Sequence, residues 1–126
     1  MVQKNQNDEM YANNIRTLRF AVTDADATDP TDPLDLTGLV VKWALSRIAP
    51  SGQFTTTAIV EKCSNDGTLT ITNPTGGLCE LTLDPADTAT LSGKFYHELE
   101  VFDSGDNGVV VATGEITILR NVVNTC

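Results

Sequence analysis

The sequence predicts an all-β fold, a sandwich of two antiparallel sheets with about seven strands. Three observations predict it. Apolar and polar residues alternate with a period of two in several segments, which is typical of strands with one buried face. Turn signals rich in Gly, Asn, Asp and Pro separate these segments roughly every 8 to 12 residues. Neither a strand–helix alternation nor a heptad repeat occurs, and an open barrel is the alternative.

The first fourteen residues differ from the rest. They are rich in Asn, Gln and charge and have no periodicity, so we expect a flexible polar arm, 1–14, before a sandwich domain, 15–126. Such an arm can become ordered by adding backbone hydrogen bonds to an exposed sheet edge, so we expect it to contact another copy or a partner. After Ile15, the apolar residues Leu18, Phe20 and Val22 recur with a period of two and predict the first strand.

An acidic loop and the clearest strand follow. Residues 24–35 contain five aspartates and two prolines, which favour a loop because proline lacks the backbone donor of a strand. Residues 38–48 then alternate regularly, with Val41, Trp43 and Leu45 on one face. This segment predicts a strand whose apolar face points into the core.

Three shorter strands are expected in the middle of the chain. Residues 55–62 are rich in β-branched side chains and follow the turn signal at 49–52. Residues 68–72 and 79–83 both alternate, and the turn signal at 73–77 separates them. These two short strands should flank a tight connection.

The last third of the chain should hold one helical turn and two long strands. Asp84 is a good N-cap, and Pro85 suits the first helical position, so a single turn is expected within residues 85–91. Residues 95–102 alternate, and a final strand is expected from Val109 to about Val123. Gly114, in the middle of that strand, predicts a bulge or kink.

The predicted core combines apolar residues from these strands with two aromatic residues. Trp43 lies beside apolar residues on its strand, and Tyr96 follows the Leu-x-Gly corner at 91–93, which is typical of sandwiches. The expected core residues are Trp43, Leu45, Leu91, Tyr96 and Leu99.

Composition excludes several classes of function. Lys and Arg number 8 against 17 Asp and Glu, a net charge of −9, so nucleic acid would be repelled. No run of 18 apolar residues and no signal peptide is present, so we expect a soluble protein without a membrane segment. The three cysteines, Cys63, Cys79 and Cys126, are odd in number and form no CxxC pair, so we expect reduced thiols and no cofactor.

The acidic loop is the one candidate metal site. Asp24, Asp26, Asp32 and Asp35 have the spacing of carboxylate ligands in a calcium loop. Asp29 stands where the sharp turn of an EF-hand needs glycine, and no helices flank the loop. A solvated acidic loop is therefore the preferred interpretation, with a calcium site of another type as the alternative.

No residue set predicts catalysis. His97 is the only histidine and lies on the inward face of its strand, which favours a core or interface role. Glu98 and Glu100 project from one face about 6.5 to 7 Å apart, a separation that glycosidases use, but neighbours on one strand usually mark a solvated face. Trp43 could stack on a ligand, but its apolar neighbours favour core packing.

Four motifs in this order carry a resemblance to a known family. They are Asp-Leu-Thr-Gly-x-x-Val-x-Trp at 35–43, Asp-x-Ala-x-Thr-x-x-Leu-x-Gly-x-x-Tyr at 84–96, Glu-Leu-x-Val at 98–101 and Gly-x-Ile-x-Ile at 114–118. The chain resembles, over 17–119, the immunoglobulin-like N-terminal module of tailed-phage upper baseplate proteins and related single-domain virion proteins. The resemblance implies an immunoglobulin-like sandwich that docks on the phage particle.

In that family a fibre-forming region follows the module, whereas this sequence ends at Cys126. We therefore expect a lone, non-enzymatic docking module of a tailed-phage virion, foremost a capsid decoration or cement protein. A tail or baseplate adaptor is one alternative, and a carbohydrate- or host-binding module is another. The expected partners are other virion proteins and further copies of the chain, possibly as a trimer, located on the virion and in the host cytoplasm before assembly.

Overall fold

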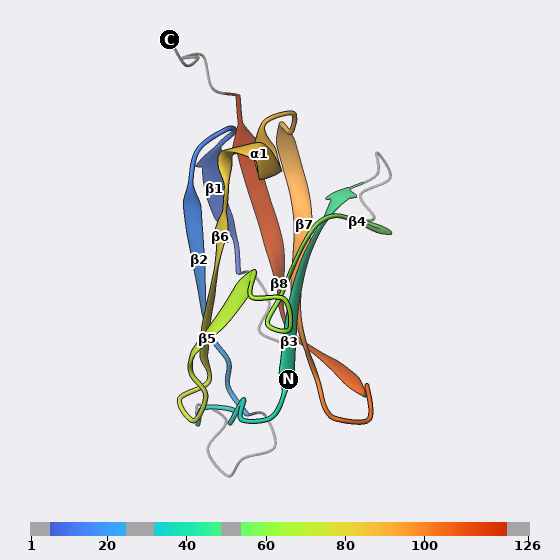
Figure 1. Cartoon of the computed structure of the whole chain (residues 1–126). Helices are drawn as coiled ribbons and strands as arrows, with labels where there is room; N and C mark the ends of the chain where they lie inside the picture. Colours follow the sequence, from blue (N-terminus) through green and yellow to red (C-terminus); the bar gives the residue numbers. More distant parts are fainter. Residues whose placement is uncertain (1–5, 25–31, 49–53, 121–126) are drawn as a thin grey trace.

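Two facing β-sheets make up the part of the chain that the computed structural model describes, residues 6–24, 32–48 and 54–120 (Figure 1). One sheet has five strands in the order β1-β8-β7-β3-β4, and the other has three in the order β2-β6-β5. The strands are β1 (Asp8–Tyr11), β2 (Arg16–Ala21), β3 (Val40–Ile48), β4 (Phe54–Cys63), β5 (Leu69–Asn73), β6 (Leu78–Leu83), β7 (Gly93–Phe102) and β8 (Gly108–Leu119). The predicted all-β, immunoglobulin-like sandwich is confirmed.

Antiparallel pairing dominates both sheets. β3 is the centre of the larger sheet, where Trp43 pairs with Lys62 of β4 on one side and with Leu99 of β7 on the other. In the smaller sheet β6 pairs with β2 and with β5. The apolar faces predicted from the period of two therefore point at each other across the sandwich.

The predicted arm is corrected by β1. Asp8–Tyr11 pairs in parallel with β8, so that Met10 lies opposite Ile118. Met10 and Ala12 are both buried in the core, and so this segment belongs to the sandwich rather than to a separate arm. A four-residue edge strand with one buried side chain is too short to produce a visible period. Residues 1–5 of the expected arm lie outside the described residues.

All the predicted core residues except Tyr96 are buried. Trp43, Leu45, Leu91 and Leu99 are buried, the tryptophan completely, at 0% exposure. Tyr96 was expected with them, but it lies half-buried on the outer face of the five-stranded sheet, and its hydroxyl donates a hydrogen bond to Glu98 Oε2 at 2.9 Å. The alternation along β7 explains the difference. His97 and Leu99 point inward, so Tyr96 points outward and Phe95, two residues before His97, reaches the core.

The helical turn is as short as predicted. α1 (Pro85–Thr88) follows Asp84, whose backbone N–H donates to the Asp87 carboxylate at 2.8 Å. In Figure 1 it lies at the upper end of the molecule, at the crossing from β6 in one sheet to β7 in the other. Thr88, at its last position, is fully buried.

The bulge of β8 is not at Gly114. Leu99 pairs with Ala112 and Glu100 with Val110, so the extra residue is Val111. Gly114 is regularly paired with His97, and a Cβ at this glycine would overlap the backbone of Gln6. Glycine is therefore required at this position because the backbone of Gln6 lies too close for a side chain.

Replacement of Trp43 by alanine should lower the free energy of unfolding by about 3 to 5 kcal/mol, because a completely buried aromatic side chain is removed. The matched control is Tyr96→Ala, which removes a half-buried ring and should cost about 1 kcal/mol. Both are measured by urea denaturation followed by far-UV circular dichroism, since Trp43→Ala removes the only tryptophan. Equal losses in the two variants would contradict the assignment of the core.

Candidate functional site

The lone histidine joins the N-terminal segment to the centre of the core. His97 lies on the inner face of β7, where it pairs with Leu45 of β3. The indole Nε1 of Trp43 donates to His97 Nδ1 at 2.9 Å. The backbone carbonyl of Gln6 lies 2.5 Å from His97 Nε2. Three residues far apart in the sequence thus form one hydrogen-bonded chain, the Trp43–His97–Gln6 relay.

The relay fixes the protonation of the imidazole. An indole nitrogen can only donate, so His97 Nδ1 must be the acceptor and carries no proton. The neutral ring then holds its proton on Nε2 and donates it to the Gln6 carbonyl. Burial lowers the pKa of His97, and the Gln6 carbonyl and the charge of Asp8 only partly oppose this effect. The imidazole is neutral at pH 7 and has no free nitrogen for catalysis.

A shallow hollow of about 270 Å³ lies beside the relay, between β1 and β2. Its lining residues are Gln6, Asn7, Asp8, Arg16, Thr17, Leu18, Arg19, Phe20 and His97. Arg16 spans it with two hydrogen bonds to Asp8, at 2.9 and 2.6 Å. Most polar groups that line the hollow pair with each other. The hollow therefore marks the interface between the N-terminal segment and the smaller sheet.

Further contacts hold the N-terminal segment to β8. The Gln6 N–H donates to the Thr113 carbonyl at 2.9 Å. The Glu115 N–H donates to Asn7 Oδ1 at 2.9 Å. Together with the relay and the Arg16–Asp8 pair, these contacts form what we call the N-terminal latch.

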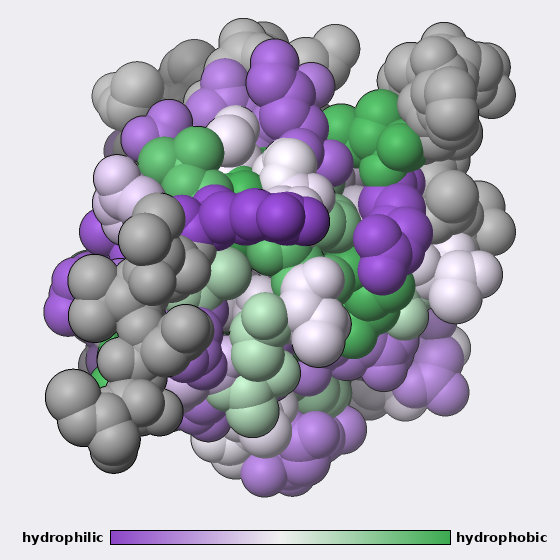
Figure 2. All heavy atoms as spheres, turned by 90° about the horizontal axis from the view of Figure 1, so that it is seen from above, coloured by the Kyte–Doolittle hydropathy of each residue, from purple (hydrophilic) through white to green (hydrophobic). Residues whose placement is uncertain are grey.

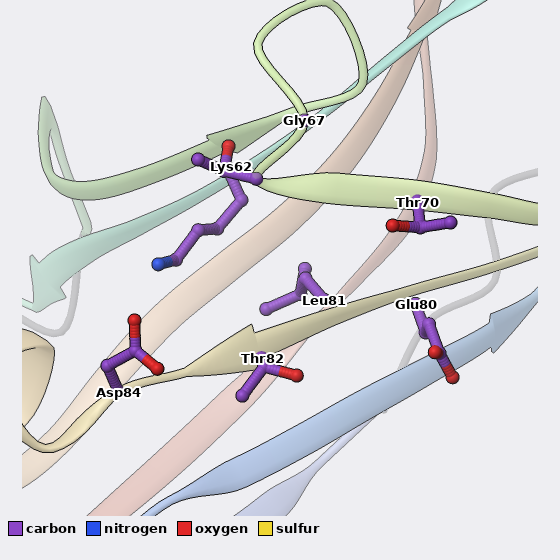
Figure 3. Close-up of a pocket in the computed structure, with 8 residues that line it drawn as sticks. Lys62, Gly67, Thr70, Glu80, Leu81, Thr82 and Asp84 are labelled. Carbon is purple, nitrogen blue, oxygen red and sulfur yellow. The ribbon is translucent and has the colours of Figure 1, made fainter.

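The second hollow, of about 320 Å³, opens between the edges of the two sheets (Figure 3). Its lining residues are Lys62, Gly67, Thr68, Thr70, Glu80, Leu81, Thr82 and Asp84. Lys62 is the only cation in this lining, and Figure 3 shows its side chain extending toward Asp84. No aromatic residue lines the hollow, so it lacks the stacking surface of a typical sugar site.

Lys62 is an inward-facing lysine with a fixed partner. Its ammonium group lies 2.9 Å from Asp87 Oδ2, and its side chain is only 10% exposed. Partial burial raises the pKa of Asp87, but the hydrogen bonds from Lys62 and from the Asp84 backbone outweigh it, so the net pKa is lowered. The pair is ionised at pH 7 and anchors α1 to β4.

The predicted metal ligands that the structure describes, Asp24, Asp32 and Asp35, form no group that could hold a metal. Asp26 lies outside the described residues. The Asp24 N–H donates to the Asp32 carbonyl at 2.8 Å, which closes the base of the loop. The Asp35 carboxylate accepts from the Thr37 N–H at 2.9 Å, and its hydrogen bonds with Thr37 lower its pKa. Within residues 6–24, 32–48 and 54–120, no group of three or more His, Cys, Asp or Glu side chains could hold a metal.

The glutamates and cysteines considered in the sequence analysis lie in surroundings that favour a structural role. Glu98 and Glu100 lie half-buried on the outer face of the larger sheet, and Glu98 accepts from Tyr96. Burial, with the nearby Glu98, raises the pKa of the Tyr96 hydroxyl to about 12. Of the cysteines, Cys63 and Cys79 are free thiols, and burial raises the pKa of Cys79 to about 11, which makes it unreactive. Cys126 lies outside the described residues.

Sequence reasoning missed the partners of His97 and the role of Lys62. Gln6 contributes a backbone carbonyl, which no side-chain pattern can reveal. Lys62 did leave a signal, because it stands at the inward position of β4 that follows Val60. A charged residue in an apolar position of the alternation predicts a buried partner.

No protein-family model and no curated protein matches the chain. Solved structures with a similar fold include CopC from Methylosinus trichosporium OB3b, at 14% identity and a TM-score of 0.42, covering 94% of this chain and 89% of that one. A chain from the structure of ICOS with ICOS-L and an anti ICOS-L VNAR domain has 14% identity and a TM-score of 0.38, covering 95% and 56%.

AggA, the major subunit of aggregative adherence fimbriae type I from Escherichia coli, has 13% identity and a TM-score of 0.35, covering 92% and 91%. All three likenesses concern the β-sandwich, and their identities and TM-scores are too low to indicate function. Among the described residues no helix is long and apolar enough to cross a membrane.

The stability of the protein should fall as the pH falls below about 6.5, the ordinary pKa of histidine. The pKa of His97 is lower in the folded state, so below pH 6.5 the unfolded chain binds a proton that the folded chain does not. The free energy of unfolding should drop by at most about 1.4 kcal/mol per pH unit. Urea denaturation between pH 7.5 and 5, above the range in which carboxylates titrate, measures the slope. His97→Gln should remove it, and an equal slope in that variant would assign it to other groups.

Loss of one partner of the Lys62–Asp87 pair should cost more than loss of both. Asp87→Ala leaves the ammonium group of Lys62 without its partner and should lower the free energy of unfolding by about 1 to 3 kcal/mol. The double variant Lys62→Met, Asp87→Ala should recover part of that loss, because the methionine needs no ionic partner. Chemical denaturation of these two variants and of Lys62→Met alone measures this. A loss in the double variant equal to the sum of the losses in the two single variants would show that the pair does not interact.

Proposed function

We propose that the chain is a non-enzymatic structural protein of a tailed-phage virion, a small sandwich that acts by docking. The observation that carries the proposal is the state of His97, the only histidine, whose two ring nitrogens are both used inside the fold. Lys62 is likewise committed to Asp87, and Glu98 accepts from Tyr96. The side chains most suited to acid–base chemistry serve stability, which favours surfaces over a reaction centre.

The virion setting comes from the motifs at 35–43, 84–96, 98–101 and 114–118, which resemble those of the phage module. The fold supports this setting, because a sandwich of two sheets is the scaffold that the resemblance implies. The net charge of −9 also favours a protein partner over packaged nucleic acid. We infer that the chain decorates the capsid, with other virion proteins as its partners. A tail or baseplate adaptor is the alternative.

The test is whether the purified chain binds to phage particles. Fluorescently labelled protein should co-sediment with tailed phage particles produced by cells that carry the gene for this chain. An excess of unlabelled protein should displace the labelled protein. An unrelated acidic protein of similar size is the control and should not compete. Binding to separated heads supports decoration, and binding to separated tails supports the adaptor. Absence of the chain from purified particles, despite its presence in the lysate, would overturn the proposal.

A further inference from the structure

β1 is attached to the rest of the chain by a short turn. Residues 12–15 carry the chain from β1 in the larger sheet to β2 in the smaller one, and we call Asn13 and Asn14, in the middle of this connection, the hinge. The chain reverses direction over this distance, as the ribbon shows (Figure 1). Asn13 adopts a φ of 65°, the left-handed conformation that asparagine tolerates better than most other residues and that suits a tight turn. β1 and β2 are therefore joined by a tight turn and not by a long loop.

The contacts of residues 6–12 all reach across to the body of the sandwich. The latch joins Gln6, Asn7 and Asp8 to residues of β2, β7 and β8. Met10 is buried in the core, and Ala12 N–H donates to the Leu119 carbonyl at 2.8 Å. None of these interactions depends on the hinge itself, so the same segment from another molecule could make every one of them.

The hinge is flanked by exposed apolar side chains. Tyr11 is 53% exposed and Ile15 70% exposed, and they are two of the four large hydrophobic residues on the surface of the described part. Figure 2 views the molecule from this end and shows apolar side chains at the surface among polar ones. Single exposed residues are ordinary, but a pair on either side of a tight hinge lies where two molecules would meet if their hinges opened.

We propose that β1 is exchanged between two copies of the chain, each copy inserting residues 6–12 against β8 of the other. The exchanged pair keeps the latch and the buried Met10 and brings Tyr11 and Ile15 of both copies together. Exchange of identical elements is an accessible route to dimers, and a short hinge favours it. The inference deepens the proposed function by naming a second copy as partner, but it concerns the purified chain alone and can fail or succeed without any particle.

The first test changes the length of the hinge. Hinge length determines whether β1 can pair with β8 of its own chain, and changing it leaves the residues of the latch intact. Deletion of Asn13 and Asn14 leaves too little chain to reverse between sheets about 10 Å apart. This variant should be a dimer at every concentration by multi-angle light scattering. Insertion of Gly-Ser-Gly-Ser after Asn13 is the matched control and should weaken dimerisation of the full chain at least tenfold.

A disulfide trap gives the second test and works even if the deletion variant fails to fold. Glu9 of β1 lies opposite Thr117 of β8. Two proteins are made in a Cys63→Ser, Cys126→Ser background, one with Glu9→Cys and the other with Thr117→Cys. They are mixed at high concentration, unfolded and refolded together, and oxidised. Exchange places the two new thiols side by side in different molecules and should give a covalent heterodimer.

The control mixture replaces Thr117→Cys by Thr70→Cys, an exposed position on β5 of the other sheet. A heterodimer at least tenfold more abundant in the first mixture than in the control supports exchange. Equal yields in the two mixtures would overturn it. So would a deletion variant that is folded and monomeric.

Discussion

The hydrogen bond between Trp43 and His97 is the constraint on which the rest of the structure depends. It is a contact between the centre of the larger sheet and its neighbouring strand, and it is completely buried. Because the indole can only donate, the imidazole must present its proton on the other side, where it meets the carbonyl of Gln6. A polar group in the core is thereby satisfied, and the N-terminal segment is held in place by the same ring. Gly114 completes this arrangement, since any side chain there would displace Gln6.

The same use of polar residues recurs elsewhere in the fold. His97, Lys62 and Asp87 each lie partly or wholly within the fold with a fixed partner, and so each converts a possible catalytic group into a structural one. Tyr11 and Ile15, by contrast, are exposed on either side of the hinge.

The layers of the fold could be predicted from the sequence, because the period of two in β2, β3 and β7 records which face is buried. The helical turn at Pro85 could be predicted from its cap. β1 could not, since a short edge strand with a single buried methionine has no period, and Tyr96 was misplaced because a corner motif outweighed the alternation that places Phe95 inside. The latch was beyond prediction for another reason: its key acceptor is a backbone carbonyl, 91 residues from the histidine in the chain.

The central claim is that His97 is neutral, protonated on Nε2 and bonded to Trp43 within the core. Nitrogen-15 NMR of the intact chain tests it most directly, because the sequence contains one histidine and one tryptophan and each side chain gives one set of signals. At pH 7 we expect an imidazole with its proton on Nε2 and an indole N–H that exchanges with solvent only on global unfolding. An imidazole protonated on Nδ1, a charged ring, or an indole N–H that exchanges within minutes would contradict the account.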